Sequence, residues 1–351
     1  MATAIFKGVQ ITGLASAVPT CIERINSYME KFGKETVEKF ICTTGVKERR
    51  SAIRLQTASD LCYVAAKELI QFKQYGAESI DGVILITQFP DYDTPATAHI
   101  LHKRLNLTNN CIAMDINLGC SGFVYGINIA ASLIKSGALQ RILLCCGDIR
   151  GWTIPEDDKS MSMLFGDAGA AVIIEAENDT IRTLLKADGS GYQALLMPGV
   201  NSRIHIDFNH FNYNSVKATM DGMAVFEFSI SEVPRTFREY FQTFGGTIDD
   251  FDYCVFHQAN LLMLEHIRKK IRLPKEKMPV SIDRYGNTSS ASIPLTIADL
   301  CQRENCPDKI HFITSGFGVG LSWGIADFTL DKKDILPVIE TDDYFKEAFV
   351  G

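Results

Sequence analysis

The sequence lacks several features that would assign it to a simple class. No apolar run approaches the roughly 20 residues that a membrane-spanning helix needs. No Cys-x-x-Cys pair occurs among the ten cysteines, and no low-complexity segment divides the 351 residues. The start lacks the long apolar core of a signal peptide. These absences argue against a membrane span, a secreted disulfide scaffold and a metal or dithiol site. We therefore expect a cytoplasmic protein that binds neither metal nor membrane.

The overall charge balance argues against a general nucleic-acid binder, because the formal net charge is −7. A content of 46% hydrophobic and 22% charged residues is typical of a folded globular protein. One segment, 268–277, departs from this balance. Its cations are Arg268, Lys269, Lys270, Arg272, Lys275 and Lys277. They form either a solvated helix end or a docking patch for an acidic partner or a phosphate-bearing ligand.

Short apolar strands alternate with helical patterns along the chain, which indicates an α/β protein. The order of these elements occurs twice. A strand and a helix within 82–105 precede a strand–turn–helix unit within 111–135. A strand and a helix within 253–271 precede a second such unit, which opens with a predicted strand at 280–283. The repeated order predicts a duplicated fold.

We therefore predict an N-terminal half at 1–180 and a C-terminal half at 181–330, with a first strand at 5–15. An acidic extension follows at 331–351. The extension is either a loosely packed tail or a segment that contacts a second subunit or a partner.

Cys120 lies between an apolar, strand-like run and a helical pattern that begins at Gly122. This arrangement places the sulfur at the positive end of a helix dipole, where the thiolate is favoured over the thiol. Buried cysteines after strands are also commonly inert. The pattern alone therefore leaves a nucleophile and a structural residue both open.

His257 and Asn287 are the other two polar residues expected at strand ends beside helix starts. In a duplicated fold, Cys120 and Asn287 would occupy equivalent helix starts in halves that face one another. His257 would end a strand between them. Each has an ordinary structural interpretation, but together they predict one pocket that contains all three side chains.

Several sequence blocks resemble the β-ketoacyl-acyl carrier protein synthase III family, the initiating condensing enzymes of the thiolase superfamily. The blocks are TGVKERR (44–50), LGCSGF (118–123), FGDAGAAV (165–172), FHQAN (256–260), YGNTSSAS (285–292) and GFGVGLSWG (316–324). They occur in the family's order. The resemblance implies a thiolase-like fold, in which two duplicated α/β halves form a layered αβαβα core.

The resemblance also implies a ping-pong reaction. Cys120 would take an acyl group from a thioester, and His257 and Asn287 would stabilise the enolate formed when a malonyl thioester loses CO2. The product would be a 3-oxoacyl thioester. The backbone N–H groups of Cys120 and Val319 would form the oxyanion hole. Val319 interrupts a glycine triplet of the family, and a β-branched residue disfavours positive φ.

The partners implied by the resemblance are a second copy of the chain, acyl carrier protein and a CoA thioester. Acyl-CoA or acyl-carrier protein would be a substrate, and no cofactor is implied. Candidate binding residues are Lys159, facing the CoA adenine, and Phe317. Lys269 and Lys270 match basic positions for carrier docking, and Thr94 lies where an aromatic residue often enters the partner's acyl pocket.

Three other functions remain open at this point. The same fold could transfer an acyl group to an oxygen, nitrogen or sulfur acceptor, with His257 as general base. The order Cys, His, Asn also fits a papain-like hydrolase, although the sequence context of such enzymes is absent. A non-catalytic partner subunit is the third. The acyl chain, the donor's carrier and the pathway are left open.

Overall fold

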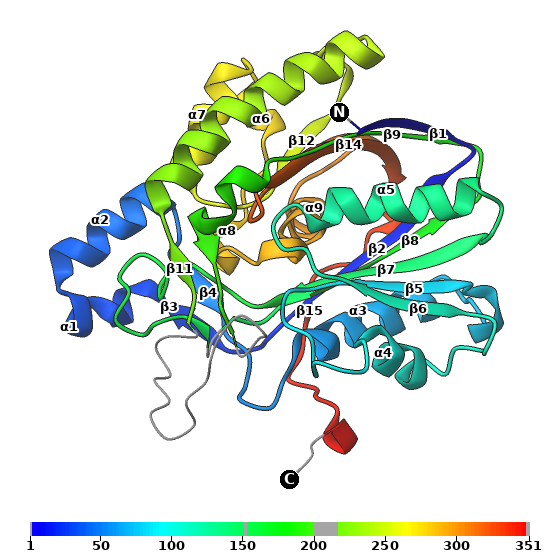
Figure 1. Cartoon of the computed structure of the whole chain (residues 1–351), viewed down its shortest axis with the longest axis horizontal. Helices are drawn as coiled ribbons and strands as arrows, with labels where there is room; N and C mark the ends of the chain where they lie inside the picture. The colour runs from blue at the N-terminus through cyan, green and yellow to red at the C-terminus, as the bar shows by residue number, and fades with distance from the viewer. Residues whose placement is uncertain (1, 151–152, 200–216, 349–351) are drawn as a thin grey trace.

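The computed structural model describes residues 2–150, 153–199 and 217–348. These residues form five alternating layers of helices and sheets (Figure 1). The helices are α1 (Met29–Phe32), α2 (Lys34–Thr44), α3 (Ala58–Phe72), α4 (Ala98–Arg104), α5 (Gly122–Lys135), α6 (Gly222–Phe244), α7 (Leu261–Lys270), α8 (Ile282–Tyr285) and α9 (Ser292–Arg303). Helix α3 covers one sheet, α6 covers the other, and α5 and α9 lie between the sheets. The αβαβα core predicted from the resemblance is confirmed.

The first sheet has the strand order β15-β2-β8-β7-β5-β6. Its strands are β15 (Ile339–Glu340), β2 (Gln10–Val18), β8 (Ala168–Glu175), β7 (Arg141–Asp148), β5 (Gly82–Ile86) and β6 (Ile112–Ile116). The second sheet has the order β1-β9-β14-β13-β12. Its strands are β1 (Ala2–Lys7), β9 (Thr180–Ala187), β14 (Ser322–Asp331), β13 (Lys309–Gly318) and β12 (Tyr253–Phe256).

The two sheets share one pattern of strand directions. In the first, β5 runs parallel to β7, which is antiparallel to β8, and β8 is antiparallel to β2. In the second, β12, β13, β14 and β9 follow the same sequence of parallel and antiparallel pairs. The strands at the chain ends cross between the halves, because β1 pairs with β9 and β15 pairs with β2. Two short ribbons, β3 (Ile22–Arg24) with β4 (Glu48–Arg50) and β10 (Leu195–Leu196) with β11 (Thr219–Met220), lie outside the sheets.

Helix α5 sits unusually close to the first sheet. A β-carbon added to Gly122 would lie 2.3 Å from the Cγ2 atom of Ile86 in β5. The apolar residues of α5 and α9 then fill the space between the sheets, where they form the largest buried cluster. This close packing fixes the start of α5, and with it the position of Cys120.

Two strand predictions are wrong. The single strand expected at 5–15 is broken into β1 and β2, because Gly8 has a φ of +80° and the chain turns to a different sheet there. The strand expected at 280–283 is instead a loop at 280–281 followed by the first two residues of α8. Pro279 has no N–H for a ladder, and the Ser281 N–H donates to the Gln258 side chain instead.

The C-terminal extension is not a loose tail over its described part. Strand β15 adds to the first sheet, and the Gln56 amide donates to the backbone carbonyls of Thr341 and Asp343. The Arg104 guanidinium lies between the rings of Tyr63 and Phe345, at 4.0 and 4.8 Å from their centres. These contacts fasten the extension to the N-terminal half. Its possible contact with a second subunit stays a prediction.

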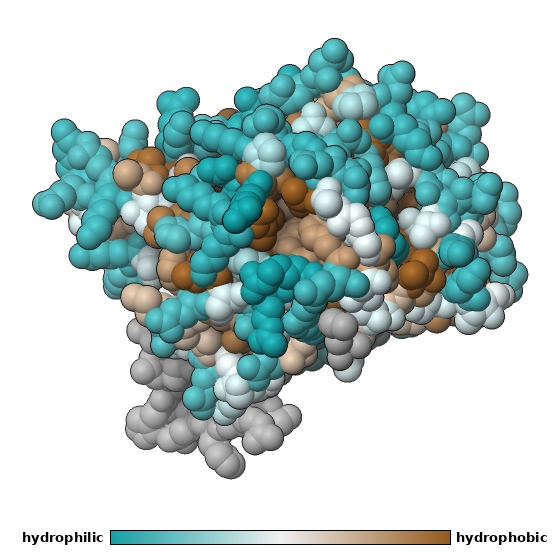
Figure 2. All heavy atoms as spheres, turned by 90° about the horizontal axis from the view of Figure 1, so that it is seen from above, coloured by the Kyte–Doolittle hydropathy of each residue, from teal (hydrophilic) through white to brown (hydrophobic). Residues whose placement is uncertain are grey.

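Among the described residues, none of the helices combines the length and hydropathy needed to cross a bilayer. Figure 2 views the molecule from above Figure 1 and shows a face that is mostly hydrophilic, with an apolar area near its centre.

Candidate active site

Cys120 lies in the turn between β6 and α5, directly before Ser121, the N-cap residue of the helix. The end of β13 packs against it from the other half. A β-carbon added to Gly318 would lie 2.7 Å from Cβ and 3.1 Å from Sγ of Cys120. A side chain at position 318 would therefore displace the thiol. Glycine here lets the two halves meet at the sulfur.

Burial decides the resting state of this thiol. Cys120 is 5% exposed. Desolvation raises the pKa of the Cys120 thiol above its ordinary value, while the Arg150 guanidinium acts in the opposite direction. The expectation that the helix dipole makes the resting group a thiolate is therefore wrong. The sulfur must lose its proton as a thioester reacts with it.

His257 follows β12 and is buried. Its Nδ1 atom lies 2.7 Å from Ser292 Oγ, which also accepts from the Gln258 N–H at 3.4 Å. When the Ser292 hydroxyl donates to Nδ1, the proton of the neutral ring lies on Nε2. Desolvation, with a smaller contribution from Arg150, lowers the pKa of His257 to about 3. The ring is thus a neutral hydrogen-bond donor at physiological pH.

Two backbone hydrogen bonds fix the position of Asn287. Its N–H donates to Leu164 O at 2.9 Å, and its carbonyl accepts from Gly166 N at 3.1 Å. The side-chain Oδ1 accepts from Ser289 N at 3.0 Å. Since the oxygen is occupied in this way, the Nδ2 group is the part of the amide left to donate to a substrate.

Ser289 lies against both Cys120 and Asn287, and the sequence analysis did not single it out. Its hydroxyl lies 4.0 Å from Cys120 Sγ and accepts from Arg150 Nη2 at 2.9 Å. Its N–H donates to Asn287 Oδ1 at 3.0 Å. Ser289 has a φ of +52°, a conformation that costs free energy and commonly marks functional sites. Its place in the YGNTSSAS block was the available signal.

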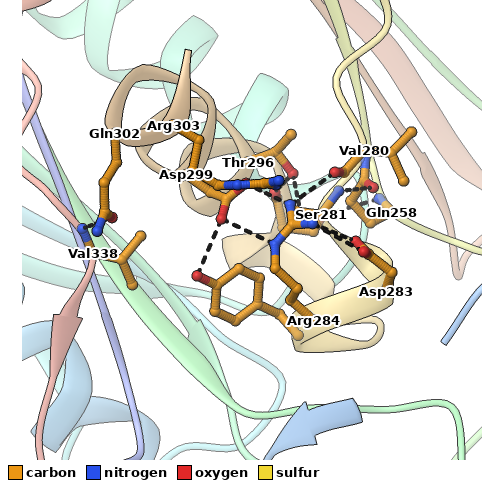
Figure 3. Close-up of polar contacts among 12 residues, drawn as sticks. Gln258, Val280, Ser281, Asp283, Arg284, Thr296, Asp299, Gln302, Arg303 and Val338 are labelled. Carbon is orange, nitrogen blue, oxygen red and sulfur yellow. Dashed lines mark hydrogen bonds and ion pairs between the residues drawn. The ribbon is translucent and has the colours of Figure 1, made fainter. Parts of the chain in front are cut away.

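A polar network joins Gln258, which follows His257, to the helices on either side of the Asn287 turn, and Figure 3 shows its members. Gln258, beside His257, accepts from Ser281 N at 3.1 Å, and Ser281 Oγ lies 2.7 Å from Thr296 Oγ1 in α9. On the other side, Arg284 in α8 donates to both carboxylate oxygens of Asp299, at 2.6 and 3.2 Å. The network ties the α8 turn, which ends just before Asn287, to the helix that carries Ser292.

The Asp299→Ala variant should lose about 3 kcal/mol of unfolding free energy, since it removes the buried partner of the Arg284 ion pair. Asp283 contacts the same guanidinium but is more exposed. The control Asp283→Asn should therefore change stability by about 0.5 kcal/mol or less. Urea unfolding measures both variants, and equal losses would show that burial does not set the strength of these pairs.

The predicted oxyanion-hole residue Val319 sits between two glycines with positive φ, Gly318 at +157° and Gly320 at +132°. Val319 itself is outside that region, so its β-branched side chain is accommodated. Within the described part of the chain, no backbone carbonyl accepts from the N–H of Cys120 or of Val319. Both amides thus remain available to a substrate oxygen.

The five candidate binding residues do not gather at the thiol. Phe317 is buried, with its ring edge-on to His257 at 5.6 Å between centres. Lys159, Thr94 and Lys269 are exposed. Lys270 Nζ donates to the Ile230 carbonyl of α6 at 2.8 Å. Within one chain, therefore, Phe317 is the member of this set that touches a catalytic candidate, and it does so as packing.

Comparison with known proteins identifies the family. The family model for 3-oxoacyl-[acyl-carrier-protein] synthase III matches residues 114–189, and the one for its C-terminal region matches residues 241–329. A β-ketoacyl-[acyl-carrier-protein] synthase III of Clostridium acetobutylicum is 34% identical over 318 residues, which cover 90% of this chain and 97% of that protein. The corresponding protein of Caldanaerobacter subterraneus is 33% identical, with coverages of 89% and 95%. The chain belongs to the 3-oxoacyl-[acyl-carrier-protein] synthase III family.

The solved structures agree with this family assignment. A 3-oxoacyl-(acyl-carrier protein) synthase from Burkholderia xenovorans superposes with a TM-score of 0.90 at 36% identity, covering 97% of this chain and 99% of that one. The present synthase III chain is therefore an acyl-transferring enzyme of the condensing type. The family does not favour the alternative of acyl transfer to an oxygen, nitrogen or sulfur acceptor.

Proposed function

We propose that this synthase III joins an acyl group, first loaded on Cys120, to the carbon unit left when malonyl-acyl carrier protein loses CO2. The observation that carries the proposal is that the buried Cys120 thiol and the oriented Asn287 amide meet at Ser289, while the His257 ring packs against Phe317, next to the Gly318 that touches the thiol. A nucleophile beside two uncharged donors suits a reaction in which negative charge develops on a thioester oxygen.

In the loading step, Cys120 Sγ attacks the carbonyl carbon of an acyl thioester. The bond between that carbon and the donor's sulfur breaks, and the proton lost by Cys120 ends on the released thiol. The N–H groups of Cys120 and Val319 stabilise the tetrahedral oxyanion. Acyl-CoA and acyl-carrier protein are both suitable donors for this step.

In the condensing step, the malonyl thioester accepts hydrogen bonds from His257 Nε2 and Asn287 Nδ2. Its carbon–carboxylate bond breaks, CO2 leaves, and the electron pair spreads onto the thioester oxygen that these donors hold. The resulting carbanion attacks the acyl carbonyl, and Cys120 departs as a thiolate that takes one proton from solvent. The step requires no metal or electron carrier, because the electron pair of the broken carbon–carboxylate bond becomes the new carbon–carbon bond.

We further propose that the enzyme acts as a cytoplasmic homodimer. The exposed loop before α4 carries Thr94, which would reach the acyl pocket of the second subunit. Lys269, Arg272 and Lys275 have no ion-pair partner among the described residues. They would contact the acidic carrier protein through charge complementarity.

The experiment that tests the proposed function follows two products. Protein loaded with an acyl group should release labelled CO2 from carboxyl-labelled malonyl-carrier protein and yield one 3-oxoacyl thioester per CO2. Acyl loss to water or to another acceptor, without CO2, would contradict condensation. A panel of acyl-CoA and acyl-carrier thioesters, examined by intact-mass analysis, identifies the donor.

A further inference from the structure

Arg150 is a buried cation beside the reactive thiol. It follows β7 and is 5% exposed. Both described hydrogen bonds of its guanidinium leave from Nη2, to Gln88 Oε1 at 3.2 Å and to Ser289 Oγ at 2.9 Å. The Nε–H group is buried and finds no acceptor in the part of the chain that the structure describes. The rings of Phe89 and Phe165 lie 5.0 and 4.8 Å from its central carbon.

No carboxylate within the described residues lies at ion-pair distance from this guanidinium. The nearby Asp148 carboxylate accepts instead from Thr87, Gln88 and Ser290. Asp167 accepts from the Ala52 N–H and from the backbone N–H of Arg150, not from its side chain. A buried charge without an opposite charge is costly, so a protein rarely keeps one unless a ligand completes it.

A pocket of about 230 Å³ adjoins Arg150. Four cations line it: Lys31, Arg49, Arg50 and Arg150. The first three have carboxylate partners in Asp157, Glu23 and Glu340, respectively. Among the described residues, Arg150 is therefore the pocket cation that remains unpaired. The Ser162 hydroxyl in the same lining also lacks a hydrogen-bond partner.

Only the Ser289 hydroxyl separates Arg150 from Cys120, since it contacts both Nη2 and Sγ. Gln88 lies against the same turn, because a β-carbon added to Gly119 would lie 2.3 Å from Gln88 Oε1. An acyl group on Cys120 whose carbonyl oxygen occupies the oxyanion hole would thus extend beside Gln88 and Arg150. Gln88 and Arg150 thus supply one amide and one cation on that side of the thiol.

We propose that the acyl group accepted by Cys120 carries a terminal carboxylate, as in a short dicarboxylic acyl thioester of the succinyl class. The inference rests on the proposed function and specifies the acyl thioester that loads Cys120. Arg150 binds the distal carboxylate through Nε–H, the donor that its contacts with Gln88 and Ser289 leave unused, and Gln88 orients the guanidinium. Loading forms the Sγ–acyl carbon bond, breaks the carbon–sulfur bond to CoA, and leaves the Cys120 proton on the CoA thiol. The distal carboxylate takes no part in bond changes.

The carboxylate of malonyl-carrier protein is the competing ligand for Arg150. That group must leave as CO2, and a cation that binds it stabilises the ground state that the reaction has to leave. A carboxylate that stays on the acyl chain is stabilised by Arg150 in the loading step and again in the condensing step. The structure therefore favours the acyl group.

The first experiment compares succinyl-CoA with butyryl-CoA, which has the same number of carbons and no carboxylate. Intact-mass analysis of the full-length protein should show succinyl loading at least about tenfold faster, and Arg150→Met should reverse that order. Arg150→Lys keeps the charge and should keep the preference. Lys34→Met, at an exposed cation of α2, is the charge-matched control and should change nothing. Wild-type loading of butyryl at an equal or faster rate would overturn the proposal. So would an Arg150→Met variant that slows CO2 release from malonyl-carrier protein without altering the loading preference.

A second experiment does not need acyl transfer at all. Iodoacetate and iodoacetamide attach groups of the same shape to Cys120, one charged and one neutral. The ratio of their Cys120 alkylation rates, read by peptide mass analysis, cancels any change in thiolate fraction. Arg150→Met should lower the iodoacetate-to-iodoacetamide ratio about tenfold, with circular dichroism confirming the fold. An unchanged ratio overturns the role of Arg150. A changed ratio in protein that no thioester loads supports the anion site and contradicts the proposed function instead.

Discussion

Cys120→Ala protein is expected to accept no acyl group from any thioester, with a loss of more than about 10⁴-fold in the loading rate. The sulfur of Cys120 is the one nucleophile that β13, the turn before α5 and Ser289 surround together. No second thiol is placed to replace it, because the other buried cysteines among the described residues lie in the cores of the two halves. Intact-mass analysis after incubation with the preferred donor measures the loss directly.

Two controls separate loss of the nucleophile from loss of the fold. Cys42→Ala changes an exposed cysteine and should leave loading unchanged. Cys120→Ser keeps the shape of the side chain, so the site should stay intact while the weaker hydroxyl nucleophile loads at least about 10²-fold more slowly. An acyl adduct that persists in Cys120→Ala would place the nucleophile elsewhere and remove the basis of the proposed reaction.

The sequence predicted the layered fold well, because periodicity marks long elements clearly. The helical pattern expected to begin at Gly122, within the unit at 111–135, is α5, which starts at Gly122 and ends at Lys135. The strand expected at 280–283 failed because the Ser281 N–H donates to the side chain of Gln258, and the chain enters α8 at the next residue. No short-range pattern encodes a tertiary hydrogen bond of that kind.

The three catalytic candidates were predicted from their positions, but their electrostatic states were not. A helix dipole is visible in the sequence, whereas the burial that outweighs it at Cys120 depends on β13 from the other half. Arg150 and Ser289 were missed for the same reason. Each lies far from Cys120 in the chain, and their meeting depends on how the halves pack. The resemblance identified the reaction type, while the polar wall beside the thiol required the packed structure.

Asn287→Asp protein should still load its acyl group at nearly the normal rate but condense it about 10²- to 10³-fold more slowly. Aspartate keeps the oxygen that accepts from Ser289 N, so the loop is preserved. The change replaces the donating Nδ2 group with an oxygen and adds a negative charge where enolate charge develops. His257→Gln, which removes the neutral Nε2 donor, should produce the same separation of the two steps.

Asn260→Asp supplies the matched control for this substitution. Asn260 caps α7 by accepting from Met263 N at 2.8 Å, and aspartate caps a helix as well as asparagine does. Both steps should therefore stay unchanged in that variant. Intact-mass loading and labelled CO2 release, measured on the same protein, distinguish the steps. If Asn287→Asp slowed loading and condensation equally, the amide would be supporting the oxyanion of the acyl transfer, and the division of labour between Val319 and Asn287 would have to be reassigned.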